Sequence, residues 1–340
     1  MTNLLYIMRR KYMRRSEFGR NEIIWANLLR IAGVAVLLAG ILPVRSSAQQ
    51  AGQKTYPTAQ AASQALVDAI KTNDESTILQ VLGPEGKDII SSGDAVEDAQ
   101  SRSDFVMRYQ EMHRLMKEPN GTTTLYVGSH NWPLPVPLVN KGGSWYFDSA
   151  TAKMEILYRR VGRNEISTIR TALELVAAEK EYAASHNGEY AQKILSDPGQ
   201  QNGLYWKVDA GQPQSPIGPL VASAVAEGYT DKVEGAPRTP YRGYMYGVLT
   251  QQGPHAPGGA KSYVVNGKMT GGFAFIAFPA EYKSSGVMTF VICQDGMVFR
   301  KDLGPNTEKI AKAIKAFNPD SSWKQDEDQQ EESAAAVKAN

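Results

Sequence analysis

The sequence is poor in the residues that build disulfides and metal sites. It holds one cysteine, Cys293, and four histidines among 340 residues. A single cysteine excludes an internal disulfide framework, and its place in the apolar run 291–293 favours a small buried side chain. No two histidines lie four residues apart or beside the cysteine, which excludes the usual zinc ligand sets.

The common catalytic and cofactor motifs are also missing. The sequence has no GxSxG nucleophile elbow, no Walker loop and no dinucleotide-binding fingerprint. Gly267-Lys268 comes nearest to a Walker loop, but Met269 stands where serine or threonine is needed. We therefore expect no cofactor, and the sequence contains no recognisable catalytic apparatus.

Continuous hydrophobic sequence is scarce as well. The strongly apolar run over 31–42 has twelve residues, whereas a membrane span needs roughly 20. A basic stretch ending at Arg30 precedes this run, and Ser46-Ser47-Ala48 follows it, as in a secretory signal. The sequence thus predicts a signal peptide over 1–48 and export to the periplasm or cell envelope. The open alternative is an uncleaved N-terminal anchor, which would be the chain's contact with the membrane.

The charge balance argues against a nucleic-acid partner. The whole chain has a net charge of +2, from 37 basic and 35 acidic residues. Residues 1–48 contain eight of the basic residues and two of the acidic ones, so the rest of the chain has a net charge of −4. Phosphate binding needs a concentrated positive face, which this balance does not supply.

The spacing of apolar residues predicts an α+β fold, with helices first and antiparallel strands after them. Thr58 and Asp74 are expected to cap two short helices, and a third helix is expected over 95–117. A long helix is expected from about Thr151 to His186. The other expected elements are strands at 122–127, 144–148, 204–208, 241–250, 272–278, 287–293 and 297–301, and helices at 219–227 and 307–317.

These elements predict two domains between two flexible ends. A disordered leader over 49–56 precedes an α+β domain over 57–150. The second domain, over 151–323, contains the long helix and an antiparallel sheet. A disordered acidic tail follows over 324–340, because its composition buries too little apolar surface to fold.

Acidic residues are the remaining candidates for catalysis. Asp94 and Asp98, or Asp148, would serve a hydrolase as paired carboxylates. The simpler interpretation of Asp94 and Asp98 is structural, because acidic side chains stabilise the start of a helix. Asp295 and Asp302 flank the last strand as weak candidate ligands for Ca²⁺, although turn chemistry explains Asp295-Gly296 equally well.

Three aromatic residues are candidates for contact with a ligand or a partner. Tyr244 and Tyr246 are two residues apart, so on a strand they share one face, while Tyr241 would point the other way. Trp132 lies beside prolines in an irregular segment. Such side chains suit an apolar pocket or a partner surface, and a core face is the alternative.

Several motifs connect the chain to a known family. They are Ser91-Ser92-Gly93-Asp94, Asn131-Trp132-Pro133, the run 143–148 (GSWYFD), the run 159–165 (RRVGRNE) and Glu181-Tyr182. From about Pro57 to Trp323 the chain resembles the bacterial domain-of-unknown-function family numbered 2950. The resemblance implies an envelope location and no particular activity.

Two weaker resemblances concern architecture. The segment 164–190 and the later strands are similar to the exposed half of a pilin or pseudopilin helix and its head sheet. Arg159 to Arg163 depart from that pattern, since charged residues occupy the place of the apolar assembly half. The half ending at Asp148 resembles a cone-shaped fold of the nuclear-transport-factor-2 type, which implies nothing about function.

These observations favour an exported, non-enzymatic binding or assembly protein of the envelope, with envelope proteins or a small ligand as partners. A hydrolase acting on an envelope polymer and a membrane-anchored accessory of a secretion or pilus system remain as alternatives. An enzyme is expected to bring two carboxylates, or a carboxylate and a histidine, together in one cleft.

Overall fold

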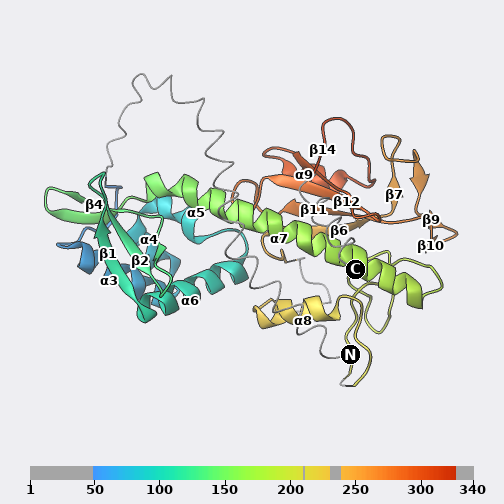
Figure 1. Ribbon diagram of the computed structural model, residues 1–340, viewed down its shortest axis with the longest axis horizontal. Helices are drawn as coiled ribbons and strands as arrows, with labels where there is room; N and C mark the ends of the chain where they lie inside the picture. The colour runs from blue at the N-terminus through green and yellow to red at the C-terminus, as the bar shows by residue number, and fades with distance from the viewer. Residues whose placement is uncertain (1–48, 210, 230–238, 327–340) are drawn as a thin grey trace. The chain divides into compact units, whose positions relative to one another are not determined.

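The structure is a computed structural model that describes residues 49–209, 211–229 and 239–326. The predicted signal peptide over 1–48 lies outside these residues. Helices come first and antiparallel strands follow, which confirms the predicted α+β class (Figure 1). Within the described ranges, no helix combines the length and the apolar character needed to cross a bilayer.

The N-terminal part begins with five helical segments. Thr58 and Asp74 cap the first two, as predicted, by accepting hydrogen bonds from the amides of Ala61 and Thr77. The fifth helix begins after Asp94, which is also its cap. The segments are α3 (Ala59–Thr72), α4 (Glu75–Leu82), the 3-10 helix η2 (Pro84–Gly86), α5 (Lys87–Ile90) and α6 (Ala95–Glu111).

Helix α6 is shorter than predicted. The expected helix ran to Lys117, but α6 ends at Glu111 and Met112 is extended. Residues His113–Lys117 form β1 instead, because they pair in antiparallel register with β2 (Thr123–Val127). Cross-strand pairing therefore overrides helical spacing here. The sheet has the order β1-β2-β4-β5, and its other strands are β3 (Trp132–Pro133), which pairs with β2, β4 (Leu138–Lys141) and β5 (Ser144–Phe147).

Both predicted disordered ends are partly folded. In the leader, Gln53 is buried and donates to the carbonyls of Val81 and Phe147, and Tyr56 forms a bridge with Trp145. In the tail, β14 (Lys324–Gln325) pairs with the preceding strand, and Asp326 is buried. Backbone pairing and buried hydrogen bonds order these residues, although their polar composition predicts disorder. The rest of the predicted tail, 327–340, lies outside the described residues.

The C-terminal part is built on a five-stranded antiparallel sheet of order β14-β13-β12-β11-β6. The strand predicted at 204–208 is wrong, since that segment makes a single bridge between Leu195 and Tyr205. The other main strands are β6 (Tyr244–Leu249), β11 (Ala274–Pro279), β12 (Met288–Cys293) and β13 (Val298–Asp302). Two short hairpins join β7 (Gln251–Gln252) to β8 (Lys261–Ser262) and β9 (Val264–Val265) to β10 (Lys268–Met269), and the helices are α8 (Gly218–Ala226) and α9 (Thr307–Ala313).

One long helix, α7 (Ser149–Ser185), connects the two sheets (Figure 1). Its 37 residues extend for about 55 Å. Near its start, Ala152 and Ile156 pack into the core of the N-terminal helices. From Ile169 onward its buried apolar face joins the core of the β6–β14 sheet. The segment between these two apolar stretches carries buried polar residues.

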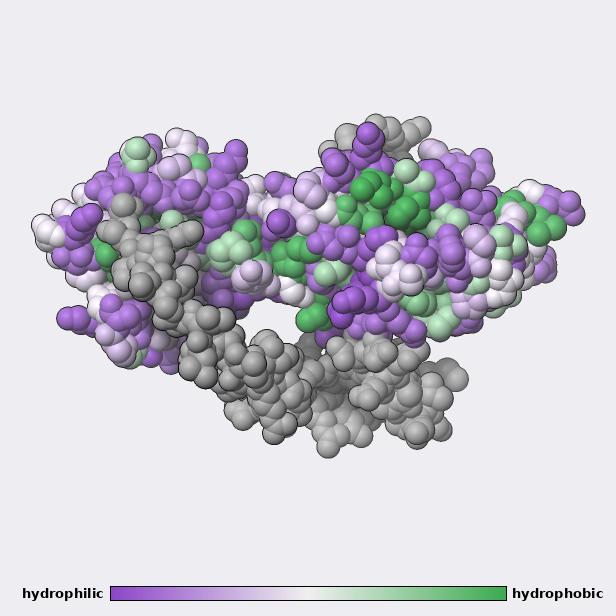
Figure 2. All heavy atoms as spheres, turned by 90° about the horizontal axis from the view of Figure 1, so that it is seen from above, coloured by the Kyte–Doolittle hydropathy of each residue, from purple (hydrophilic) through white to green (hydrophobic). Residues whose placement is uncertain are grey.

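The described residues fall within one compact unit of the chain, although their apolar side chains gather in separate clusters. The division into domains 57–150 and 151–323 therefore stays a prediction. The face shown in Figure 2 is mostly hydrophilic, with apolar residues in separate patches.

Candidate functional site

A buried polar stripe marks the middle of α7. Arg160, Asn164 and Thr168 are spaced by four residues, so they lie on one face of the helix, and all three are buried. The Arg160 guanidinium donates to the carbonyls of Asp88, Ile89 and Ser91. This stripe ties the helix to the segment around α5.

The same stripe also bonds to the C-terminal sheet. The Asn164 amide donates to the Ser285 carbonyl over 3.0 Å. The next residue, Glu165, accepts through its Oε1 from the amides of Val287 and Met288, both over 3.0 Å. The middle of α7 is therefore bonded to both halves of the fold.

Asp94 completes this arrangement from the start of α6. Its Oδ1 accepts from the amides of Val96 and Glu97 and so caps the helix. Its Oδ2 accepts from the Tyr229 hydroxyl over 2.8 Å and from the Gly243 amide over 3.0 Å. The carboxylate is 1% exposed, so these donors replace the water it has lost.

Two neighbours of Asp94 show how closely the region is packed. Burial, followed by the hydrogen bond to Asp94, raises the pKa of Tyr229, which keeps its hydroxyl protonated as a donor. Gly243 has φ of +77°, and a side-chain carbon there would lie 2.6 Å from Asn164 Nδ2. We call this region, made by Asp94, Arg160, Asn164, Tyr229 and Gly243, the polar junction.

The carboxylates proposed for a hydrolase all accept structural hydrogen bonds. Asp94 belongs to the polar junction. Asp98 accepts from the Ser92 amide with both oxygens, and Asp148 caps α7 by accepting from the amide and hydroxyl of Thr151. Asp94 and Asp148 therefore cap helices, and Asp98 binds a loop amide. These roles agree with the structural interpretation of Asp94 and Asp98.

A smaller pocket of about 350 Å³ lies beside the junction, and it contains Trp132. Asp98, Glu97 and Arg163 also line it. Burial raises the pKa of Glu97, against the effect of Arg163 at 3.3 Å. Trp132 is 36% exposed and lies in β3, where it pairs with Val127 of β2, in a different sheet from the other two aromatic candidates.

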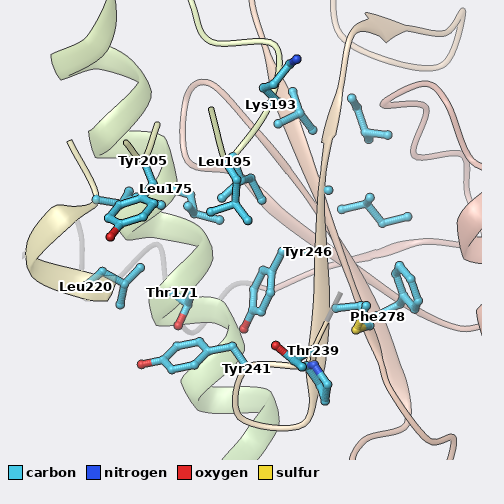
Figure 3. Close-up of a pocket in the computed structure, with 18 of the residues that line it drawn as sticks. Thr171, Leu175, Lys193, Leu195, Tyr205, Leu220, Thr239, Tyr241, Tyr246 and Phe278 are labelled. Carbon is cyan, nitrogen blue, oxygen red and sulfur yellow. The ribbon is translucent and has the colours of Figure 1, made fainter. Parts of the chain in front are cut away.

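A second cavity runs along β6 and has a volume of about 1060 Å³ (Figure 3). We call it the β6 groove. It is lined on the α7 side by Thr171, Leu175, Leu195, Tyr205, Ile217, Leu220 and Tyr246, and towards α9 by Ile276, Phe278, Ala311 and Ile314. Its walls are therefore mostly apolar, as in ligand sites generally.

Strand β6 is the last strand of its sheet, and its outer edge faces this groove. In the antiparallel pair with β11, alternate residues direct their N–H and C=O groups outward. Tyr244 is one of the outward residues, because its amide and carbonyl bond to Tyr241. Thr250 is another, because its carbonyl accepts from Tyr263. By alternation, Tyr246 and Val248 also point their backbone groups outward.

The outward groups of Tyr246 and Val248 have no hydrogen-bond partner among the described residues. The edge is thus closed at both ends, by Tyr241 and by Tyr263, and open between them. Backbone groups on an open strand edge are able to pair with a further strand.

The three aromatic candidates have different roles in the structure. Tyr244 is fully buried and donates to the Met288 carbonyl over 3.0 Å, so it belongs to the core and not to a ligand site. Tyr246 lines the groove, and its hydroxyl donates to Thr168 over 3.4 Å. Burial raises the pKa of Tyr246, so the hydroxyl stays protonated.

The predicted orientation of Tyr241 is wrong. It lies beside Tyr246 in the groove, and Figure 3 shows both rings near Thr171. The reason is a turn at Arg242 and Gly243, which both have positive φ. Tyr241 therefore lies across from Tyr244, outside β6, and strand alternation does not apply to it.

The candidate Ca²⁺ pair is also not brought together. Asp295 lies in the turn after β12, whereas Asp302 ends β13 opposite Met288. About 13 Å of strand separates these two ends. Asp302 accepts from the Tyr282 hydroxyl and the Gly304 amide. Among the described residues, no group of three metal-binding side chains comes together.

Most residues of the groove were not predicted as site residues. Residues 192–197, α8 and α9 contribute to its walls through ordinary apolar and lysine side chains. No spacing or motif distinguishes them from core or surface positions. The open stretch of β6 depends on the pairings of Tyr241 and Tyr263, which are set by tertiary structure.

Comparison with known proteins identifies a family. The family model described as "Protein of unknown function (DUF2950)" matches residues 53–325. No curated protein and no solved structure matches the chain. The likeness to pilins and to the nuclear-transport-factor-2 fold stays a prediction.

Proposed function

Because the chain belongs to the DUF2950 family, to which no activity is assigned, we propose its function from the β6 groove. The protein is an exported envelope protein that binds a ligand non-covalently in this groove. The observation that carries the proposal is an apolar cavity of about 1060 Å³ along an open strand edge. Export rests on the apolar run 31–42 and the small residues before Gln49.

The chemistry of the groove fits binding. Its polar side chains include Tyr241 and Tyr246, whose hydroxyls remain protonated because burial raises their pKa. Protonated phenols and apolar walls orient a ligand without reacting with it. The hydrolase alternative relies on carboxylates that cap helices or hold loops, outside the groove.

The groove can be filled from Gly247. A side-chain carbon at this position would lie 3.4 Å from Ile276 Cγ2, an ordinary contact, and φ there is not positive. We expect Gly247→Trp to place an indole in the groove. It should abolish binding of the apolar dye 1-anilinonaphthalene-8-sulfonate, as measured by fluorescence titration.

Val265→Trp is the matched control, because Val265 is 49% exposed on β9 and does not line the groove. This variant should bind the dye like the wild type. Equal binding by the wild type and Gly247→Trp would refute the groove as the ligand site. Mass spectrometry of molecules that co-purify with the wild type, and not with Gly247→Trp, then identifies the natural ligand.

The location is tested separately by N-terminal sequencing of the chain from cell fractions. A start at Gln49 in the periplasmic fraction supports export with cleavage. An intact 31–42 run in the membrane fraction supports the anchored accessory instead. A cytoplasmic chain would contradict both.

A further inference from the structure

We propose that the occupant of the β6 groove is an extended peptide segment of another exported protein, which adds to the sheet as a strand beside β6. This inference rests on the proposed function, and it names the class of ligand. Its basis is the open edge at Tyr246 and Val248, between the closed ends at Tyr241 and Tyr263. A strand supplies the alternating N–H and C=O groups that such an edge needs.

The position of the groove favours a strand over a compact small molecule. The cavity includes residues from both sides of the sheet, with Leu195 and Tyr246 towards α7 and Phe278 on the other side of β6 (Figure 3). Side chains of an added strand alternate between the two sides of a sheet. A peptide with apolar residues would therefore bury side chains on both sides at once.

Gly247 shapes the site in the middle of the open stretch. It pairs with Ile276 of β11, and its lack of a side chain lets Ile276 form part of the groove wall. The added strand can thus place a side chain over Gly247, against Ile276. The two outward residues, Tyr246 and Val248, flank this position.

The charged residues that line the groove indicate which charge the peptide carries. These residues are Lys193, Asp197, Lys312 and Lys315. Lys193 is paired with Asp197 over 2.7 Å, and Lys312 is paired with Glu308 over 2.6 Å. Phe317 pairs with Gln251 and Gly253, so Lys315 lies close to the C-terminal end of β6. Lys315 has no acidic partner among the described residues, and its charge favours an acidic residue or a terminal carboxylate on the peptide.

The test uses the full exported chain and a panel of fluorescein-labelled eight-residue peptides. Each peptide alternates Thr with Val, Leu or Phe and ends in two Glu residues, and binding is measured by fluorescence anisotropy. Two N-methylated versions of the best binder are then compared. One carries methyl groups on the amides along one edge of the extended peptide, and the other on the amides along the opposite edge. Methylation of the edge that faces β6 should weaken binding at least tenfold, and methylation of the other edge less than about threefold.

Val248→Pro provides the same test from the protein side. Proline removes the outward N–H of Val248 and leaves the inward bonds of its neighbours to β11, and proline is tolerated at strand edges. We expect about fivefold weaker peptide binding than for the matched control Val248→Ala. Circular dichroism checks that both variants fold. A third variant, Lys315→Glu, should weaken binding of the peptides that end in Glu. It should not weaken binding of the versions that end in Gln.

The outcomes separate this inference from the proposed function. If both methylated peptides bind equally, or if no peptide binds while the dye still does, strand addition is overturned and the groove remains a site for an apolar molecule. If neither dye nor peptide binds the wild type, both proposals fall. If Val248→Pro folds and binds peptide like Val248→Ala, the backbone of β6 takes no part.

Discussion

The start of β6 and its middle are only a few residues apart, yet the polar groups are hydrogen-bonded at the start and open in the middle. At the start, the Gly243 amide donates to buried Asp94, and Tyr244 bonds to Tyr241 and Met288. In the middle, the outward backbone groups of Tyr246 and Val248 have no partner in the described structure. Polar groups that satisfy each other hold a fold together, whereas groups left open in an apolar groove are available to a ligand.

Two of the family motifs meet at the first of these regions. Ser91 and Asp94 come from one motif, and Arg160 and Asn164 from another, and they meet at the polar junction. The side chains that line the β6 groove carry none of these motifs. These two motifs therefore build the junction between the halves of the fold, and the proposed ligand site lies elsewhere.

Removing the carboxylate of the junction should have the largest effect on stability. Asp94→Ala leaves the Gly243 amide and the Tyr229 hydroxyl without an acceptor in a buried place, and it removes the cap of α6. We expect the free energy of unfolding to fall by about 3 kcal/mol or more, as measured by urea denaturation.

Asp74→Ala is the matched control for this variant. Asp74 caps α4 with the same kind of bond to Thr77 and is exposed. It should lose far less stability than Asp94→Ala, and the difference measures the junction alone. Equal losses would mean that Asp94 acts only as a helix cap.

A second comparison sets Asp94 against Glu179, the buried carboxylate next to the groove wall. Glu179 is fully buried, but its Oε2 accepts only from the Ala191 amide, and no partner for its Oε1 is found among the described residues. Burial raises the pKa of Glu179 from 4.5 to about 8. The bond between Glu179 and the Ala191 amide fixes the residue before the segment 192–197, which lines the groove.

The raised pKa predicts how stability depends on pH. The folded state keeps the Glu179 proton up to about pH 8, whereas the unfolded chain loses it near 4.5. Stability from this group is therefore complete below pH 4.5 and falls as the pH rises towards 8. The expected slope is at most about 1.4 kcal/mol per pH unit.

Glu179→Gln tests this because glutamine resembles the protonated acid. The variant should match the wild type near pH 4.5, exceed its stability at pH 7.5, and show a flatter profile in thermal melts between these values. A wild type with the same pH profile as Glu179→Gln would contradict the assigned pKa.

Local sequence signals predicted some of these features and not others. The caps at Thr58, Asp74 and Asp94 are readable because each lies directly before a helical apolar pattern. The long helix is also close to its prediction, since its apolar spacing persists over many turns. The strand β1 was mistaken for helix because pairing with residues 123–127 decides its conformation.

The candidate site was less predictable for the same physical reason. Tyr246 was identified from its place on a strand, but so was Tyr244, which proves to be core. Strand alternation tells which residues share a face, and it does not tell how deeply each is covered. The cover over Tyr244 comes from the loop before β12, where a side-chain carbon at Gly286 would collide with the Tyr244 ring.

The two tyrosines give the smallest effect and the finest comparison between core and groove. Tyr244→Phe removes a hydroxyl that donates to the Met288 carbonyl over 3.0 Å, and it should cost about 1 kcal/mol of unfolding free energy. Tyr246→Phe removes a hydroxyl whose bond to Thr168 is long, at 3.4 Å, so the cost should stay below about 0.5 kcal/mol. Dye or peptide affinity should respond in the reverse order, because Tyr246 lines the groove and Tyr244 does not. If Tyr244→Phe changed the affinity and Tyr246→Phe only the stability, the assignment of the core and groove faces of β6 would have to be reversed.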